Sequence, residues 1–238
     1  VQKANKNNMG VPFYKVGRLP EWEEETFIHR VKDLRSKGAK YISIKTGPFR
    51  PADLAKTIML ASKAGVDMVT VDGAGGGTGN SPIHMMNEWG YPTIYLETVL
   101  YRICQEMQNK KIPLPTIVIA GGFAFEDQIF KGLALGAPHI KIIGIGRAAM
   151  AAAMVGETFG EMIKKGSIPK ELSKFGQSIP EIFCGIPELR ARFGQEVKNI
   201  PTAALAVFNY IERVNTGLQQ LMALCRKYQL DYIKRDDI

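Results

Sequence analysis

Cysteine, long apolar runs and clusters of like charge are all scarce in this chain of 238 residues. Its three cysteines, Cys104, Cys184 and Cys225, are odd in number, far apart and without metal-ligand spacing. This pattern disfavours a disulfide framework and a metal site, and it favours a reducing, cytoplasmic setting. No apolar run approaches the roughly 20 residues of a membrane-spanning helix, and the polar start of the chain lacks a signal-peptide core. We therefore expect a cytoplasmic protein with no membrane partner.

The charge balance is basic, with 31 lysines and arginines against 23 acidic residues and a formal net charge of +8. The basic residues are scattered along expected helix faces instead of forming one patch, so we do not expect nucleic acid as a partner. Attraction for a small anionic substrate fits the same charge. The apolar share of 45% is ordinary for a globular protein and is sufficient for a packed core.

Apolar strands alternate with helical patterns through the first 150 residues. We expect strands at 41–45, 67–72, 116–120 and 140–145, and helices at 21–37, 51–64, 97–108 and 126–135. Because the strands are almost continuously apolar, this alternation predicts an α/β protein with a parallel sheet. Further helices are expected at 148–165 and 202–228, with irregular polar chain at 166–199. Residues 151–238 are thus expected to form a helical C-terminal extension that packs on a domain of residues 1–150.

Two glycine-centred loops follow the last two of these strands. The first holds Gly121 and Gly122, and the second holds Gly144 and Gly146 followed by Arg147. Glycine lets backbone N–H groups approach an anion closely because no Cβ intervenes. Two such loops in succession match the phosphate site after the last two strands of a TIM (β/α)8 barrel. Arg147 either adds a charged contact to the phosphate or lies on the outer helix.

Polar side chains end the first two strands. Lys45 and Asp72 lie at strand tips, where a barrel carries its functional residues. Lys45 is either an electrostatic group of the site or a lysine that emerges into solvent, and Asp72 is either a general base or a loop hydrogen-bonder. A long glycine-rich loop at 73–82 follows Asp72. Its residues 73–79 form either an anion nest or lid, which we favour, or a flexible connection rich in glycine.

Four strand–helix units make half of an eight-stranded barrel and leave two open sheet edges. Three arrangements are compatible with this count: a chain whose first barrel half is missing, a half-barrel closed by a partner, or an open doubly wound sheet. We favour the first. The open edges also make self-association into a homo-oligomer a reasonable expectation.

These motifs, in this order and spacing, resemble the FMN-binding barrel of the glutamate synthase family. The resemblance rests on the stretches 42–45 and 71–82 and on the two glycine loops. It covers about residues 22–154, which correspond to the second half of the family's barrel.

The resemblance implies an FMN-dependent oxidoreductase that reduces an imine, formed from ammonia and 2-oxoglutarate, by hydride transfer from reduced FMN. It places the FMN phosphate on the two glycine loops and Lys45 near the flavin and the 2-oxo acid. Lys45 and Asp72 are the catalytic candidates. The candidates for cofactor binding are Lys45, Gly76, Gly77, Thr78, Gly121, Gly122, Gly144, Gly146 and Arg147.

The chain departs from the family pattern where an iron–sulfur cluster is usually held. Residues 150–158 contain no cysteine, and Cys184 alone cannot hold a cluster that needs three or four thiolates. We therefore expect no iron–sulfur cluster in this chain. Electrons would then come either directly from NAD(P)H or from a separate protein, and a separate protein is also a candidate supplier of ammonia. Two further readings stay open: a phosphosugar- or phosphonucleotide-binding barrel without flavin, and a non-catalytic half-barrel that needs a partner chain.

Overall fold

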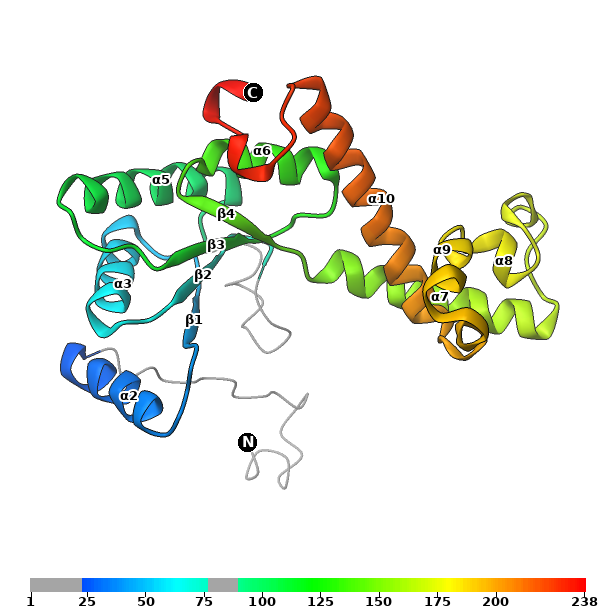
Figure 1. Cartoon of the computed structure of the whole chain (residues 1–238), viewed down its shortest axis with the longest axis horizontal. Helices are drawn as coiled ribbons and strands as arrows, with labels where there is room; N and C mark the ends of the chain where they lie inside the picture. The colour runs from blue at the N-terminus through cyan, green and yellow to red at the C-terminus, as the bar shows by residue number, and fades with distance from the viewer. Residues whose placement is uncertain (1–22, 77–89) are drawn as a thin grey trace, which may run out of the picture.

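The computed structural model describes residues 23–76 and 90–238. Its centre is a four-stranded parallel sheet in the order β1-β2-β3-β4, with each strand hydrogen-bonded to the next in the chain (Figure 1). The strands are β1 (Ser43–Thr46), β2 (Met68–Asp72), β3 (Thr116–Ala120) and β4 (Ile140–Gly144). All four expected strands are therefore present, with ends within two residues of those expected.

A helix precedes β1 and a helix follows every strand. These helices are α2 (Glu24–Ser36), α3 (Pro51–Ala64), α5 (Thr93–Asn109), α6 (Glu126–Gly136) and α7 (Arg147–Lys165). Helix α3 illustrates how the sequence sets the bounds, since Pro51 occupies its first turn and Gly65 ends it in the left-handed conformation at φ 77°. No helix within the described ranges is both long and apolar enough to cross a membrane.

The two faces of the sheet have different roles. One face carries β-branched side chains such as Val69, Val71, Ile117 and Ile119, which are buried against α3, α5 and α6 in one apolar core. The residues that alternate with these along the strands line an open cavity on the opposite face; they include Lys45, Thr70, Asp72 and Ala120. A doubly wound sheet would carry helices on both faces. Among residues 23–76 and 90–238, the helices that pack on the sheet cover one face, and the four units have the arrangement of half a TIM barrel, with helices outside and the cavity side inside.

Helix α5 begins four residues earlier than the sequence pattern indicates, at Thr93 and not at Glu97. Pro92 occupies its N-cap position, and the first turn exposes Ile94 and Tyr95 to solvent. Exposed apolar side chains obscure the amphipathic pattern there, so the sequence reading missed this turn.

The C-terminal region is helical, as expected, but residues 166–199 are more ordered than the irregular chain predicted for them. They contain 3-10 turns at Ser173–Phe175 and Gly194–Asn199 and the short helices α8 (Ile179–Ile182) and α9 (Ile186–Phe193). These elements bury a second, smaller apolar cluster together with the start of α10 (Thr202–Leu224). We call this part of the molecule, with the end of α7, the C-terminal lobe. The expected boundary at residue 150 falls within α7.

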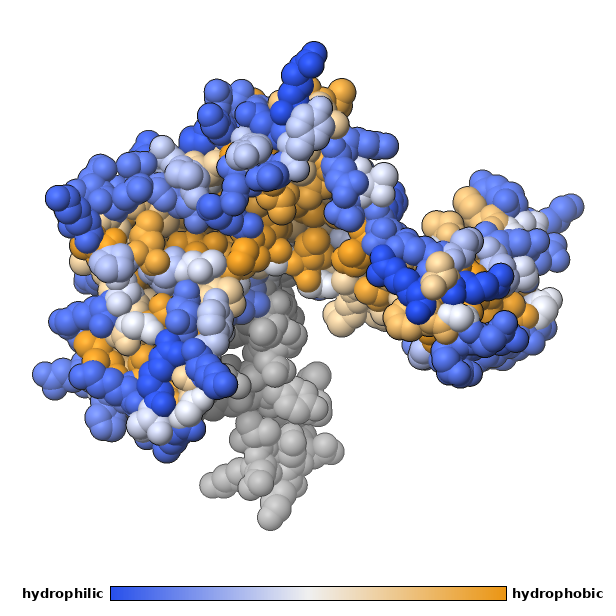
Figure 2. All heavy atoms as spheres, in the orientation of Figure 1, coloured by the Kyte–Doolittle hydropathy of each residue, from blue (hydrophilic) through white to orange (hydrophobic). Residues whose placement is uncertain are grey.

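Helix α10 joins the C-terminal lobe to the sheet domain (Figure 1). Its Leu205 belongs to the small cluster of the lobe, whereas Val214 and Met222 belong to the main core. Apolar side chains accordingly gather in two places on the face drawn in Figure 2, over the sheet domain and over the lobe. The chain ends in 3-10 turns at Leu230–Tyr232 and Arg235–Asp237, with Ile233 buried between them against the main core.

Candidate functional site

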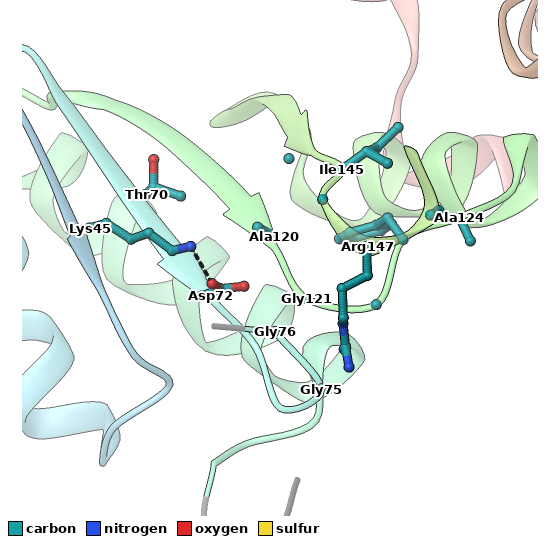
Figure 3. A pocket seen from close by; sticks show the side chains of 15 residues that line it. Lys45, Thr70, Asp72, Gly75, Gly76, Ala120, Gly121, Ala124, Ile145 and Arg147 are labelled. Carbon is teal, nitrogen blue, oxygen red and sulfur yellow. Dashed lines mark ion pairs between the residues drawn. The ribbon is translucent and has the colours of Figure 1, made fainter. Parts of the chain in front are cut away.

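An open cavity of about 550 Å³ lies at the carboxyl ends of the strands (Figure 3). This is the edge at which parallel α/β sheets bind ligands, and the volume is typical of small-molecule sites. The cavity is lined by Lys45, Thr70, Asp72, Gly75, Gly76, Ala120, Gly121, Gly122, Phe123, Ala124, Gly144, Ile145, Gly146, Arg147 and Ala148.

All the candidate residues that the structure describes line this one cavity, although they come from four segments far apart in the sequence. They are Lys45, Asp72, Gly76, Gly121, Gly122, Gly144, Gly146 and Arg147. The remaining candidates, Gly77 and Thr78, lie outside the described residues. Within residues 23–76 and 90–238, no group of three metal-ligating side chains comes together.

Lys45 and Asp72 form an ion pair in which Lys45 Nζ and Asp72 Oδ2 are 2.6 Å apart (Figure 3). The register of the sheet brings them together, because Lys45 on β1 is opposite Thr70 on β2 and Asp72 follows two residues later on the same face. The Asp72 side chain is 7% exposed, whereas that of Lys45 is 45% exposed. The buried carboxylate thus holds an accessible ammonium group at the cavity wall.

Gly76 is fitted closely to this pair. A Cβ built on Gly76 would lie 1.8 Å from Asp72 Oδ1, so any side chain at position 76 would displace the carboxylate. The Gly76 N–H donates to the Gly73 carbonyl at 2.9 Å, which closes a tight turn directly after β2. The turn and the carboxylate therefore fix one another.

The first glycine loop has a backbone conformation that favours glycine. Gly121 and Gly122 have φ values of 123° and 85°. A Cβ on Gly121 would lie 2.7 Å from the Gly73 backbone nitrogen, whereas a Cβ on Gly122 would meet no atom within 4 Å. Gly121 therefore allows the loop after β3 to pack closely on the loop after β2. Gly122 lines the cavity, and the space that a side chain at this position would fill is open.

The second wall of the cavity is the start of helix α7. Gly146 is its N-cap, no side chain of the described residues caps its first N–H groups, and no acidic residue lies in its first turn. The free N–H groups and the helix dipole make such an end attractive to anions. The side chain of Arg147 extends from this end toward Gly75, where its Nη2 would lie 3.8 Å from a Cβ (Figure 3). Two sources of positive potential thus face the first glycine loop.

The sequence reading missed three polar residues in or beneath the site. Thr70 lines the cavity between the strand positions of Lys45 and Asp72, and its spacing of two from Asp72 was a signal for it. Thr93 Oγ1 donates to the Gly121 carbonyl at 2.7 Å and so holds the glycine loop from below. Glu97, one turn further along α5, is only 2% exposed, and burial raises its pKa to about 7. No local pattern signals the last two roles, which depend on tertiary contacts.

Comparison with known proteins identifies relatives of the chain. The family described as the conserved region in glutamate synthase matches residues 20–158. The glutamate synthase large subunit-like protein of Rhizobium meliloti is 28% identical over 249 aligned positions, which cover 99% of this chain and 52% of that protein. The archaeal-type glutamate synthase (NADPH) of Dehalococcoides mccartyi is 34% identical over 91 residues, or 38% of this chain and 17% of that protein. The archaeal glutamate synthase (NADPH) of Archaeoglobus fulgidus is 33% identical over 81 residues, or 34% of this chain and 15% of that protein. The chain spans about half the length of the first of these relatives.

Proposed function

This chain belongs to the glutamate synthase family, and from that membership we propose that its cavity is the phosphate-binding half of an FMN site in an oxidoreductase. The observation that carries the proposal is the convergence of both glycine loops and the first turn of α7 on one cavity. Since the chain spans about half the length of the Rhizobium meliloti relative, the activity of a whole enzyme and its partners are part of the proposal.

The residues present fit a phosphate group. Gly122 leaves an open space that a Cβ would fill, and Gly146 also has no atom within 4 Å of its Cβ position. Arg147 adds a guanidinium, whose planar donors suit phosphate oxygens. In the proposed site, Gly121 and Gly122 bind one side of the phosphate, and Gly146 and Arg147 bind the other. Among the described residues that line the cradle, Asp72 is the one acidic side chain, and it is paired with Lys45.

When bound, FMN supplies hydride transfer, which the protein side chains cannot supply themselves. The role proposed for Lys45 is electrostatic: its accessible ammonium holds negative charge, either of the flavin ring or of a substrate carboxylate. Asp72 acts through Lys45, since the 2.6 Å contact holds the ammonium group at the cavity wall. Loss of Asp72 would therefore release Lys45.

The proposed reaction is the reductive amination of 2-oxoglutarate or a related 2-oxo acid through its imine. A small anionic substrate fits the basic chain and the accessible ammonium of Lys45. Residues 150–158 carry no cysteine where relatives are expected to hold an iron–sulfur cluster, so a separate protein is proposed as electron donor, and ammonia is supplied from outside this chain. A cytoplasmic location remains a prediction from cysteine usage.

A charge-neutralising variant tests the phosphate site. FMN binding is followed by the visible absorption of the flavin in the wild type, in Arg147→Gln and in Arg102→Gln, an exposed arginine on α5 outside the cavity. Arg147→Gln is expected to weaken FMN binding about tenfold or more, as for a charged hydrogen bond, while Arg102→Gln leaves it unchanged. The proposal is refuted if the wild-type protein leaves the absorption spectrum of FMN unchanged at saturating FMN. Equal FMN affinities of the three proteins would exclude Arg147 from the site.

A further inference from the structure

The glycine loop of the cavity is held from outside the barrel by helix α10. Three residues on one face of α10, at spacings of three and four, contact the chain directly after Gly121 and Gly122. The Tyr210 hydroxyl donates to the Ala124 carbonyl at 2.7 Å, and the guanidinium of Arg213 lies 5.9 Å from the centre of the Phe125 ring. A Cβ on Gly217 would lie 2.6 Å from Glu126 Cγ, so α10 approaches the start of α6 closely there.

We propose that Tyr210 is a positioning residue for phosphate binding, which fixes the Gly121–Ala124 segment in its anion-binding conformation; this inference rests on the proposed function of the cavity. Ala124 lines the cavity, and its carbonyl accepts the Tyr210 hydrogen bond. The loop is thus held at both ends by hydroxyl groups, by Thr93 at Gly121 and by Tyr210 at Ala124, each at 2.7 Å.

Two such restraints matter because the consecutive glycines between them restrict the backbone little. Consecutive glycines at positive φ have many alternative conformations, and a bound anion needs only one of them. A hydrogen bond at each end removes alternative loop conformations before the ligand arrives, so the loop loses less conformational entropy when the ligand binds. Burial raises the pKa of the Tyr210 hydroxyl, which keeps its proton available for donation to Ala124.

The same helix also restrains the second wall of the cavity. Helix α7, which begins at Arg147 directly after its N-cap Gly146, packs along α10 through glycines: a Cβ on Gly156 would lie 2.4 Å from the Cβ of Ala206. A Cβ on Gly160 would lie 2.1 Å from Thr202 Oγ1. Figure 1 shows α10 running from the C-terminal lobe to the flank of α6. One rigid element therefore contacts both α7 and the segment that follows the glycine loop.

The test compares FMN with riboflavin, which has the same ring system without the phosphate. Dissociation constants are measured by flavin fluorescence for the wild type, Tyr210→Phe and Tyr228→Phe, the last being a tyrosine that is 79% exposed. Tyr210→Phe is expected to weaken FMN binding about five- to tenfold, the size of one neutral hydrogen bond, and riboflavin binding by less than twofold. Thr93→Val should give the same selective loss from the other end of the loop. Tyr228→Phe should change neither constant.

A second measurement needs no ligand. Amide hydrogen exchange of residues 121–125 is compared between the wild type and Tyr210→Phe, and the exchange rates of this segment are expected to rise about five- to tenfold in the variant. Unchanged exchange, or an equal loss of FMN and riboflavin affinity, would overturn the inference. A wild type that binds no FMN would refute the proposed function, while the exchange experiment would still decide whether Tyr210 holds the loop.

Discussion

Replacing Glu97 by glutamine should change how the stability of this protein depends on pH. Glu97 lies on α5 with only 2% of its surface exposed, close to Gly132 of α6 and behind the glycine loop. Within the described part of the chain no hydrogen bond or ion pair to its carboxyl is observed. Burial without a partner disfavours the charged form, and the pKa of Glu97 is raised from 4.5 to about 7.

The sign and size of the effect follow from this shift. The unfolded chain loses the Glu97 proton near pH 4.5 and the folded protein near pH 7, so the folded state is disfavoured as pH rises between these values. At about 1.4 kcal/mol per pKa unit, the wild type should lose about 2 to 3 kcal/mol of unfolding free energy from this group between pH 5 and pH 8. Glutamine cannot ionise, so Glu97→Gln should lack this loss.

The assay is urea unfolding of the wild type, Glu97→Gln and Glu106→Gln at pH 5 and pH 8. Glu106 is an exposed residue on the same helix, and its variant should behave as the wild type does. Desolvation lowers the pKa of His139, which makes stability rise with pH below about 6.5, but this contribution is common to all three proteins. The reasoning is refuted if Glu97→Gln and the wild type change in stability by the same amount between the two pH values.

Two further variants separate the site from the core. Gly122→Ala and Gly38→Ala place a methyl group at φ values of 85° and 93° without contact to any atom within 4 Å, so each should lower the unfolding free energy by about 1 to 2 kcal/mol. Only Gly122→Ala should also weaken FMN binding. If both variants bind FMN with the same affinity, no ligand lies at Gly122. Leu100→Ala removes a fully buried side chain of the main core and should lower the unfolding free energy by about 2 to 5 kcal/mol, measured by chemical denaturation. A loss below about 1 kcal/mol would contradict the central position of Leu100 in the core.

Local sequence patterns predicted the sheet domain well because its signals are local. The strand at Thr116–Ala120 and the helix at Pro51–Ala64 have the expected bounds, since β-branched runs and the proline and glycine at the helix ends act within a few residues. The candidate residues converge on one cavity for the same reason, because strand ends and the loops after them meet at one edge of a parallel sheet.

The supports of the site could not be predicted in this way. Thr93 contacts a carbonyl 28 residues away, and Tyr210 contacts one 86 residues away. Neither residue lies in a motif, and a threonine or tyrosine on a helix surface carries no signal of its distant partner. Glu97 occupies a buried position on α5, and a glutamate gives no signal of burial because charged side chains are mostly exposed. Helices α8 and α9 were missed because they are short and rely on the tertiary cluster of the C-terminal lobe.

The central claim is that the two glycine loops and the start of α7 bind a phosphate group of FMN. Calorimetric titration of the wild-type protein with FMN and, in parallel, with riboflavin tests it most directly. The account predicts that FMN binds at least about tenfold more tightly, because only FMN engages Gly122 and Arg147. Equal affinities for the two flavins, or no binding of FMN, would contradict it.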